Sequence, residues 1–112
     1  MERFVKGDIV VTSFPFSDLT SSIKRPALVV ANLKGEDLIL CQITSKEHVS
    51  DPYQILLNPD DLSKRGLKIK SFIKPSILFT LRKSIIIRSA GRISEKKIND
   101  VENKICKIIR NH

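Results

Sequence analysis

Three polar side chains stand at the ends of two predicted strands. Arg25 comes just before the apolar run Ala27–Ala31, and Thr44 and Ser45 come directly after the run Leu38–Ile43. If the two runs pair as a hairpin, the start of the first lies beside the end of the second, so Arg25 and Thr44 share one edge of a sheet. A guanidinium offers two parallel donors to phosphate oxygens, and hydroxyl groups add further hydrogen bonds. The spacing therefore indicates a phosphodiester site, although a surface cation beside two turn residues would give the same pattern.

Other arrangements of catalytic or metal-binding residues find little support. The two histidines, His48 and His112, form no cluster, and the two cysteines, Cys41 and Cys106, cannot make a tetrahedral zinc site without further ligands. The adjacent acids of the Asn-Pro-Asp-Asp segment 58–61 fit a turn or a helix cap better than an acid–base pair. No glycine-rich phosphate loop is present. We therefore expect neither a metal nor a cofactor.

Length and composition indicate one small globular domain. The chain has 112 residues with 20 Lys and Arg against 12 Asp and Glu, a formal net charge of +8. We expect residues 1–112 to form a single domain, since domains usually run to roughly 100–200 residues. No apolar run approaches the roughly 18–20 residues that span a bilayer, and the N-terminal segment lacks the features of a secretory signal, so we expect a cytoplasmic protein without membrane binding. The positive charge favours a polyanionic partner, although a solvated basic face is an equally common cause.

Most of the chain has the pattern of short strands separated by turns. We expect residues 62–68 to be loop-like, Lys74 and Pro75 to end a strand, and residues 90–92 to break the pattern again. The predicted strands are Asp8–Phe16, Ala27–Ala31, Leu38–Ile43, Tyr53–Leu57, Ile69–Ile73 and Ser84–Ser89.

The segment Ser94–Arg110 is the one convincing helix. Ser94 is suited to cap its first turn, and Ile93 is placed to pack on Ile98 as a hydrophobic staple. The apolar stripe on one face is expected to be core or a subunit contact, and its members are Ile98, Val101, Ile105, Ile108 and Ile109. The fold class expected is mainly β, a small barrel of short antiparallel strands with a C-terminal helix, because barrel closure removes exposed strand edges.

Several short motifs together resemble the MazF/PemK toxins of toxin–antitoxin systems. Each piece alone is weak, but their order and spacing match over nearly the whole chain. The pieces are Gly7–Val10, Phe14–Asp18, Lys24–Val30, Ile43–Ser45, Ser71–Pro75, Phe79–Leu81, Lys83–Ser84 and Gly91–Ser94.

The resemblance implies an SH3-like barrel that forms a homodimer and cleaves single-stranded RNA without metal or cofactor. In such enzymes the 2′-hydroxyl of the substrate attacks the neighbouring phosphate and leaves a 2′,3′-cyclic phosphate and a 5′-hydroxyl. Carried over by position, Arg25 would stabilise the phosphorane and Thr44 would hold the scissile phosphate, with Ser45 assisting. The resemblance also implies a cognate antitoxin that occupies the RNA groove. An acidic disordered tail would suit a basic toxin.

The remaining expected RNA contacts flank this site. The first loop contributes Phe16, Asp18 and Lys24, and the segment after the third strand contributes His48. Exposed bases of single-stranded RNA are read by stacking and by hydrogen bonds to their edges, for which Phe16 and His48 offer rings. The sequence does not identify the general base of the reaction. Asp18 is a candidate for that role, and it is equally a candidate for contacting the nucleotide bases.

The chain departs from the family where some members carry an arginine and an acidic residue. Lys74 and Ser76 stand at these positions, and we expect both to contact RNA. Ser76 also keeps a second hypothesis open, namely a relative that has lost activity. A further alternative is a toxin acting on a protein, as CcdB toxins of similar fold act on gyrase.

Overall fold

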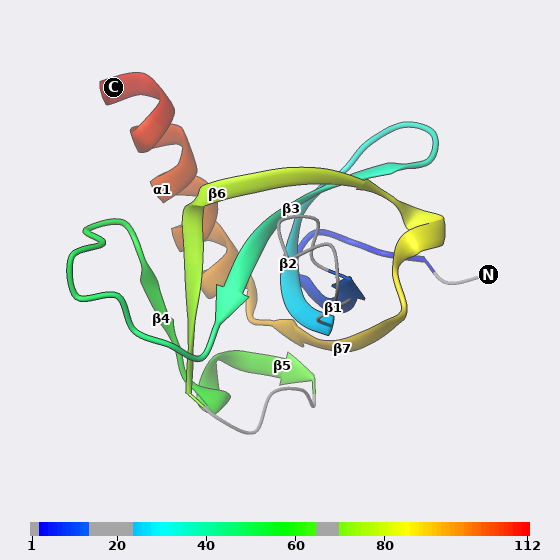
Figure 1. The fold of residues 1–112 in the computed structure, drawn as a ribbon, viewed down its shortest axis with the longest axis horizontal. Coiled ribbons are helices and arrows are strands. Elements are labelled where there is room, and N and C mark those ends of the chain that lie inside the picture. The colour runs from blue at the N-terminus through cyan, green and yellow to red at the C-terminus, as the bar shows by residue number, and fades with distance from the viewer. Residues whose placement is uncertain (1–2, 14–23, 65–69) are drawn as a thin grey trace, which may run out of the picture.

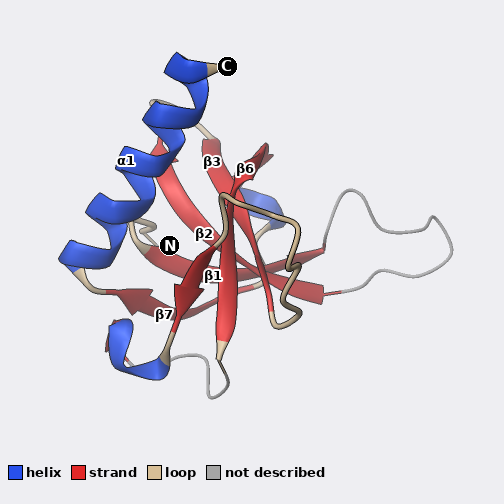
Figure 2. Ribbon diagram, turned by 90° about the vertical axis from the view of Figure 1, so that its left-hand side faces the viewer, coloured by secondary structure: helices blue, strands red, loops and turns tan. Residues whose placement is uncertain are grey.

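The computed structural model describes residues 3–13, 24–64 and 70–112. Within these residues seven strands form one antiparallel sheet in the order β4-β6-β3-β2-β1-β7-β5. The sheet curls into a half-barrel, and helix α1 packs beside β6 (Figures 1 and 2). The predicted class, mainly β with a C-terminal helix, is confirmed. The elements are β1 Asp8–Ser13, β2 Lys24–Asn32, β3 Asp37–Thr44, β4 Ile55–Leu57, the 3-10 turn η1 Pro59–Asp61, β5 Leu62–Lys64, β6 Ser71–Arg82, the 3-10 turn η2 Lys83–Ile85, β7 Arg88–Ile93 and α1 Glu95–Asn111.

The predicted hairpin is present as β2 and β3. Ala27 pairs with Gln42, and the antiparallel ladder continues toward the turn that joins the strands. Strand β2 begins at Lys24, earlier than predicted, because its first residues also pair with β1. Pro26 stands opposite Val11 in that ladder, where it supplies no backbone donor.

Strand β6 does not end at Lys74 and Pro75, as the sequence predicted; it runs on to Arg82. Gln42 of β3 pairs with Lys74, but the preceding residue Cys41 pairs with Leu78, so residues 75–77 have no partner in this ladder. A proline is tolerated in a strand at such an irregularity because no ladder hydrogen bond is required of it. The same irregularity turns β6 through a corner (Figure 1).

Two other sequence predictions were wrong. The run Ser84–Ser89 was expected to be a strand, but its first residues belong to the 3-10 turn η2, and β7 begins only at Arg88. Strand β7 also passes through the predicted break at residues 90–92. Ile9 pairs with Gly91 and Val10 with Ser89, which leaves a bulge between them, and Gly91 takes a φ of 149° that other residues rarely adopt.

The segment 62–68 was expected to be loop-like, but its first three residues form strand β5, which pairs with β7. A strand this short is hard to predict from one sequence, because its formation depends on the strand with which it pairs. Residues 65–68 lie outside the described part of the chain, as do Phe14–Phe16 and Ile69, the ends of two other predicted strands.

The helix is as predicted, with Ser94 as its N-cap. The Ser94 side chain accepts a hydrogen bond from the backbone of Lys97 at 3.2 Å. Ile98 and Val101 are buried, but Ile109 near the C-terminus is 70% exposed. Ile105 also packs against the core, so the apolar stripe contributes to the core from Ile98 to Ile105. No helix in the described ranges is long and apolar enough to cross a membrane.

Buried residues lie on both faces of the curled sheet. One cluster joins the sheet to α1 and the other fills the opposite face. Residues of β2 and β3 alternate between them, as strand geometry requires. Leu28 and Cys41 belong to the helix-side cluster, whereas Ala27, Val29 and Leu40 belong to the other. This alternation decides which polar side chains share a face.

Candidate active site

Arg25 and Thr44 lie at the same end of the β2–β3 hairpin. The recorded pairing of Ala27 with Gln42, continued by two residues, sets Arg25 opposite Thr44. On its other side Arg25 pairs with Thr12 of β1. Residues directly opposite in antiparallel strands point to the same face, so these side chains form a polar row across three strands.

Within the described residues, the Thr44 hydroxyl accepts a hydrogen bond and donates none. Its hydroxyl oxygen accepts a hydrogen bond from the backbone of Lys46 at 3.2 Å, and only 8% of the residue is exposed. Thr44 pairs with Phe72 of β6, which extends the row, and the Lys70 ammonium lies 5.8 Å from the centre of that ring. Such a row can present a hydroxyl donor and a guanidinium to one phosphate group.

A second row lies two residues further into the sheet. Gln42 stands between Ala27 on one side and Lys74 on the other. By the two-residue period of strands, this row faces the same way as Arg25 and Thr44. Gln42 is half-buried, and sequence reasoning missed it. The sequence did contain a signal for it. Gln42 is polar, lies on the same strand face as Leu40, and stands in the otherwise apolar run Leu38–Ile43.

Lys74 is buried, and its ammonium is fully engaged. The nitrogen lies 2.5 Å from a carboxylate oxygen of Asp51, with the lysine side chain 6% exposed and the aspartate side chain 15%. It also lies 3.2 Å from Nδ1 of His48 and 3.5 Å from Oε1 of Gln54. Lys74 thus ties the β3–β4 loop to the corner of β6. Its predicted contact with RNA stays a prediction.

Asp51 remains ionised in this setting. Burial raises the pKa of its carboxyl, but the hydrogen bond and the charge of Lys74, with hydrogen bonds from the backbone of the loop, outweigh burial and lower the pKa below its ordinary value of 3.8. One of these backbone donors is Tyr53, at 2.8 Å. Sequence reasoning missed Asp51, since no spacing rule connects it with Lys74.

Two residues close the β3–β4 loop on itself. The backbone of His48 donates to the Gln54 side chain at 3.3 Å, and the Gln54 amide donates to the backbone carbonyl of His48 at 3.0 Å. The backbone of His48 is therefore held by this reciprocal contact, and its ring is held by Lys74. The residue is exposed, as a contact with an external ligand requires.

The other predicted site residues are placed as follows. Lys24 and Ser45 are exposed near the polar row, at the first residue of β2 and just after β3. Ser76 is exposed within the unpaired residues at the corner of β6. Phe16 and Asp18 lie outside the described residues. Each of their roles toward RNA stays a prediction.

No metal-binding cluster of three or more His, Cys, Asp or Glu side chains occurs in the described ranges. The two cysteines are free, with Cys41 buried and Cys106 exposed. Burial raises the pKa of Cys41 to about 12. Neither thiol belongs to the polar rows.

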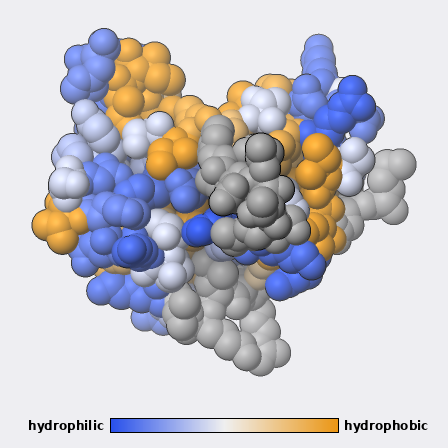
Figure 3. Space-filling model, viewed as in Figure 1, coloured by the Kyte–Doolittle hydropathy of each residue, from blue (hydrophilic) through white to orange (hydrophobic). Residues whose placement is uncertain are grey.

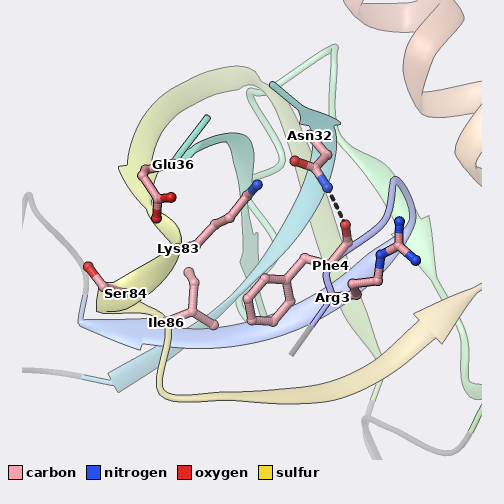
Figure 4. A pocket seen from close by; sticks show the side chains of 7 residues that line it. All are labelled: Arg3, Phe4, Asn32, Glu36, Lys83, Ser84 and Ile86. Atoms are coloured by element: carbon pink, nitrogen blue, oxygen red, sulfur yellow. Dashed lines mark hydrogen bonds between the residues drawn. The ribbon is translucent and has the colours of Figure 1, made fainter. Parts of the chain in front are cut away.

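A hollow lies at the opposite end of the hairpin from Arg25. Its walls come from the N-terminal segment, the end of β2, the β2–β3 turn, and η2 with the residues that follow it (Figure 4). The side-chain amide of Asn32 donates to the backbone of Phe4 across it. Because Asn32 is the last residue of β2 and Arg25 lies next to the first, this hollow takes no part in the candidate site.

The surface differs between the two sides of the molecule. In Figure 3 hydrophilic atoms predominate on the side that carries the β3–β4 loop, at the left, with hydrophobic atoms at its edge and above it, and hydrophobic atoms gather near η2 at the right. Ile85 and Ile87, next to that turn, are 47% and 45% exposed.

The fold is shared with solved toxin structures. An endoribonuclease from a mycobacterial species, in complex with its cognate antitoxin, superposes with a TM-score of 0.74 at 14% identity over 96% of this chain and 95% of that chain. Toxin MazF-mt6 of Mycobacterium tuberculosis superposes with a TM-score of 0.70 at 12% identity, over 92% of this chain and 96% of that chain. MazF from Deinococcus radiodurans superposes with a TM-score of 0.67 at 15% identity, over 93% of each chain. Identities this low establish the fold and no more.

The sequence itself carries the family assignment. No curated protein matches the chain. Residues 5–109 match the family described as PemK-like, MazF-like toxin of type II toxin–antitoxin system. Since this match spans both strands of the hairpin, the β3–β4 loop, β6 and most of α1, the chain belongs to the PemK/MazF toxin family.

Proposed function

We propose that this protein is a metal-independent endoribonuclease that cleaves single-stranded RNA, with messenger RNA as the expected target. The 2′-oxygen of one nucleotide attacks the adjacent phosphorus while the bond to the 5′-oxygen of the next nucleotide breaks. The 2′-proton passes to a base, and the departing 5′-oxygen takes up a proton. The products are a 2′,3′-cyclic phosphate and a 5′-hydroxyl, with no redox change and no co-reactant.

Arg25 and Thr44 carry the chemistry in this proposal. The Arg25 guanidinium neutralises the charge that builds up on the phosphorane, and the Thr44 hydroxyl donates to an oxygen of the same phosphate. Ser45 adds a further donor beside it. The observation that carries the proposal is the register of the β2–β3 hairpin. It aligns a half-buried arginine with a threonine whose hydroxyl proton has no acceptor among the residues that the structure describes.

Two partners belong to the proposal. The protein acts as a homodimer, and the exposed isoleucines beside η2 supply apolar surface of the kind that subunit contacts cover. A cognate antitoxin with an acidic disordered tail competes with RNA for the basic groove, favoured by the net charge of +8. One structural neighbour is a complex of an endoribonuclease with its antitoxin, which supports this expectation.

The decisive experiment uses a long unstructured RNA in the presence of EDTA. Purified protein is expected to cut it at specific sites and to leave cyclic phosphate ends, which mass spectrometry identifies. Arg25→Ala should lose at least about a hundredfold in cleavage rate, the usual scale for removal of a donor to a developing charge. Arg82→Ala is the matched control, since Arg82 is exposed at the far end of β6 and pairs with the first residue of β3.

Two results would contradict the proposal. Full cleavage by Arg25→Ala would refute the role of the arginine. Absence of cleavage by folded wild-type protein across diverse RNAs would refute the activity and favour a binding-only toxin, for which inhibition of gyrase supercoiling is the next measurement.

A further inference from the structure

The Lys74 ammonium fixes the proton position on the His48 ring. An ammonium has only donors, so a contact of 3.2 Å between the lysine nitrogen and Nδ1 of His48 requires that Nδ1 accept the hydrogen bond. A neutral imidazole that accepts at Nδ1 carries its proton on Nε2, and an imidazolium could not make this contact. The ring is therefore a donor at Nε2.

His48 is exposed, and among the described residues its Nε2 meets no partner. Lys74 shares the face of the sheet that carries Thr44 and Arg25, one row away, so the ring at the end of its side chain lies beside the polar row. The free N–H thus stands at the margin of the proposed phosphate site.

Asp51 keeps this arrangement in place. Its carboxylate neutralises the buried ammonium. Without that negative charge, a cation on a residue that is only 4% exposed would destabilise the fold. Gln54 contacts both Lys74 and the backbone of His48, which holds the loop against the lysine. The lysine that contacts the ring is thus accompanied by its compensating anion and by a neutral amide.

We propose that His48 contacts the RNA as a neutral hydrogen-bond donor, through Nε2–H to a phosphate oxygen, and that Lys74 and Asp51 are positioning residues that set this tautomer. The inference rests on the proposed function in that the ligand is single-stranded RNA. It gives Lys74 a role through His48 in place of direct contact with the substrate. It also excludes His48 as the general base while the contact with Lys74 is made.

The first test reads the tautomer without RNA. Nitrogen-15 correlation spectra of the His48 ring, assigned with His48→Gln, should show a proton on Nε2 and a bare Nδ1 in the wild-type protein. In Lys74→Met the ring should lose this fixed pattern and average between both tautomers, whereas Lys83→Met should leave it unchanged. Lys83 is a suitable control because its ammonium donates to a backbone carbonyl at the opposite end of the hairpin. A wild-type ring protonated on Nδ1, or averaged, overturns the proposal.

The second test measures binding of a fully 2′-O-methylated RNA, which cannot be cleaved. Lys74→Met should weaken its Kd by more than about twofold, because the ring then averages between two tautomers, of which one lacks the donor at Nε2, and is no longer held in place by the lysine. A glutamine amide places an N–H near the position of Nε2–H, and it carries this donor permanently because it has no tautomers. His48→Gln should therefore bind nearly as tightly as wild type, whereas His48→Ala should bind more weakly.

The double variant separates positioning from general stability. In the His48→Gln background Lys74→Met should cost less than about twofold, because the donor is then permanent. An equal loss in both backgrounds means that Lys74 acts only through the fold, and an unchanged Kd in Lys74→Met means that it does not act at all; either overturns the proposal. Binding that passes this test in a protein that does not cleave RNA would refute the proposed enzyme and leave this inference standing.

Discussion

The Lys74 ammonium and the Asp51 carboxylate form a buried ion pair that joins the corner of β6 to the β3–β4 loop. Neither residue lies near the other in sequence. Residues 75–77 beside Lys74 lack partners in the β3–β6 ladder, and the loop around Asp51 is held by side-chain contacts such as that of Tyr53 with His112. The pair therefore adds to the rigidity of this side of the site.

Removal of one partner should cost more stability than removal of both. Asp51→Ala leaves the Lys74 cation buried without its anion, and we expect the free energy of unfolding to fall by about 3 kcal/mol. The double variant Asp51→Ala/Lys74→Met leaves no such charge and should recover part of the loss. Urea denaturation of the three proteins measures this. A double variant as unstable as the sum of the single ones would mean that the two side chains act independently.

Acid should weaken the same contact. The pKa of Asp51 in the folded protein lies below its ordinary value of 3.8. A carboxyl with a depressed pKa stabilises the fold above its ordinary pKa, and this stabilisation is lost as the pH falls through the folded value. The difference in Tm between wild type and Asp51→Asn should therefore be constant from neutral pH to about pH 5 and should shrink in stronger acid. A difference that grew in acid would have the wrong sign for this pair.

The Thr44 hydroxyl should matter for catalysis more than for folding. Thr44→Val keeps the shape and removes both the donor to phosphate and the acceptor used by the backbone of Lys46. We expect a loss of about a hundredfold in cleavage rate and about 1 kcal/mol in stability. Thr44→Ser restores the hydroxyl and should restore most of the rate. Equal rates for the serine and valine variants would show that the methyl group, and not the hydroxyl, is what the site needs.

The two cysteines should differ sharply in reactivity. Burial raises the pKa of Cys41 to about 12, so almost none of it is the reactive thiolate at neutral pH, while Cys106 is exposed on α1. Iodoacetamide should therefore modify the folded protein once, at Cys106, and modify it twice in denaturant. Mass spectrometry of wild type and Cys106→Ser checks this. Rapid double labelling of the native protein would show that strand β3 opens.

Local patterns in the sequence were sufficient for the hairpin and the helix. The two apolar runs, bounded by polar turns, predicted the antiparallel pairing that aligns Arg25 with Thr44, and Ser94 marked the start of α1. Both features depend on residues close together in the chain. The serine cap of the helix and the two-residue period of the strands are properties of single elements, so they can be recognised without tertiary information.

The course of β6 and the surroundings of Lys74 could not be predicted in the same way. Pro75 has the pattern of a strand end, and only the irregular ladder with β3 lets the strand continue through it. Asp51 looks like an acid of a polar loop, and only the folded chain brings it to Lys74. Interactions of this kind are decided by tertiary packing, on which intrinsic propensities have little influence.

The continuity of β6 through its corner also bears on the order in which the two polar rows are assembled. One strand pairs with both β3 and β4, and it supplies Lys74 and Phe72 to the rows that begin with residues translated much earlier. Contacts between distant parts of a chain form slowly, because the intervening loop must close before they give any stabilisation. A nascent chain that displays Arg25 and Thr44 but has not yet released β6 from the ribosome therefore lacks half of the face. The two polar rows are therefore completed late in folding, once β6 has paired with β3.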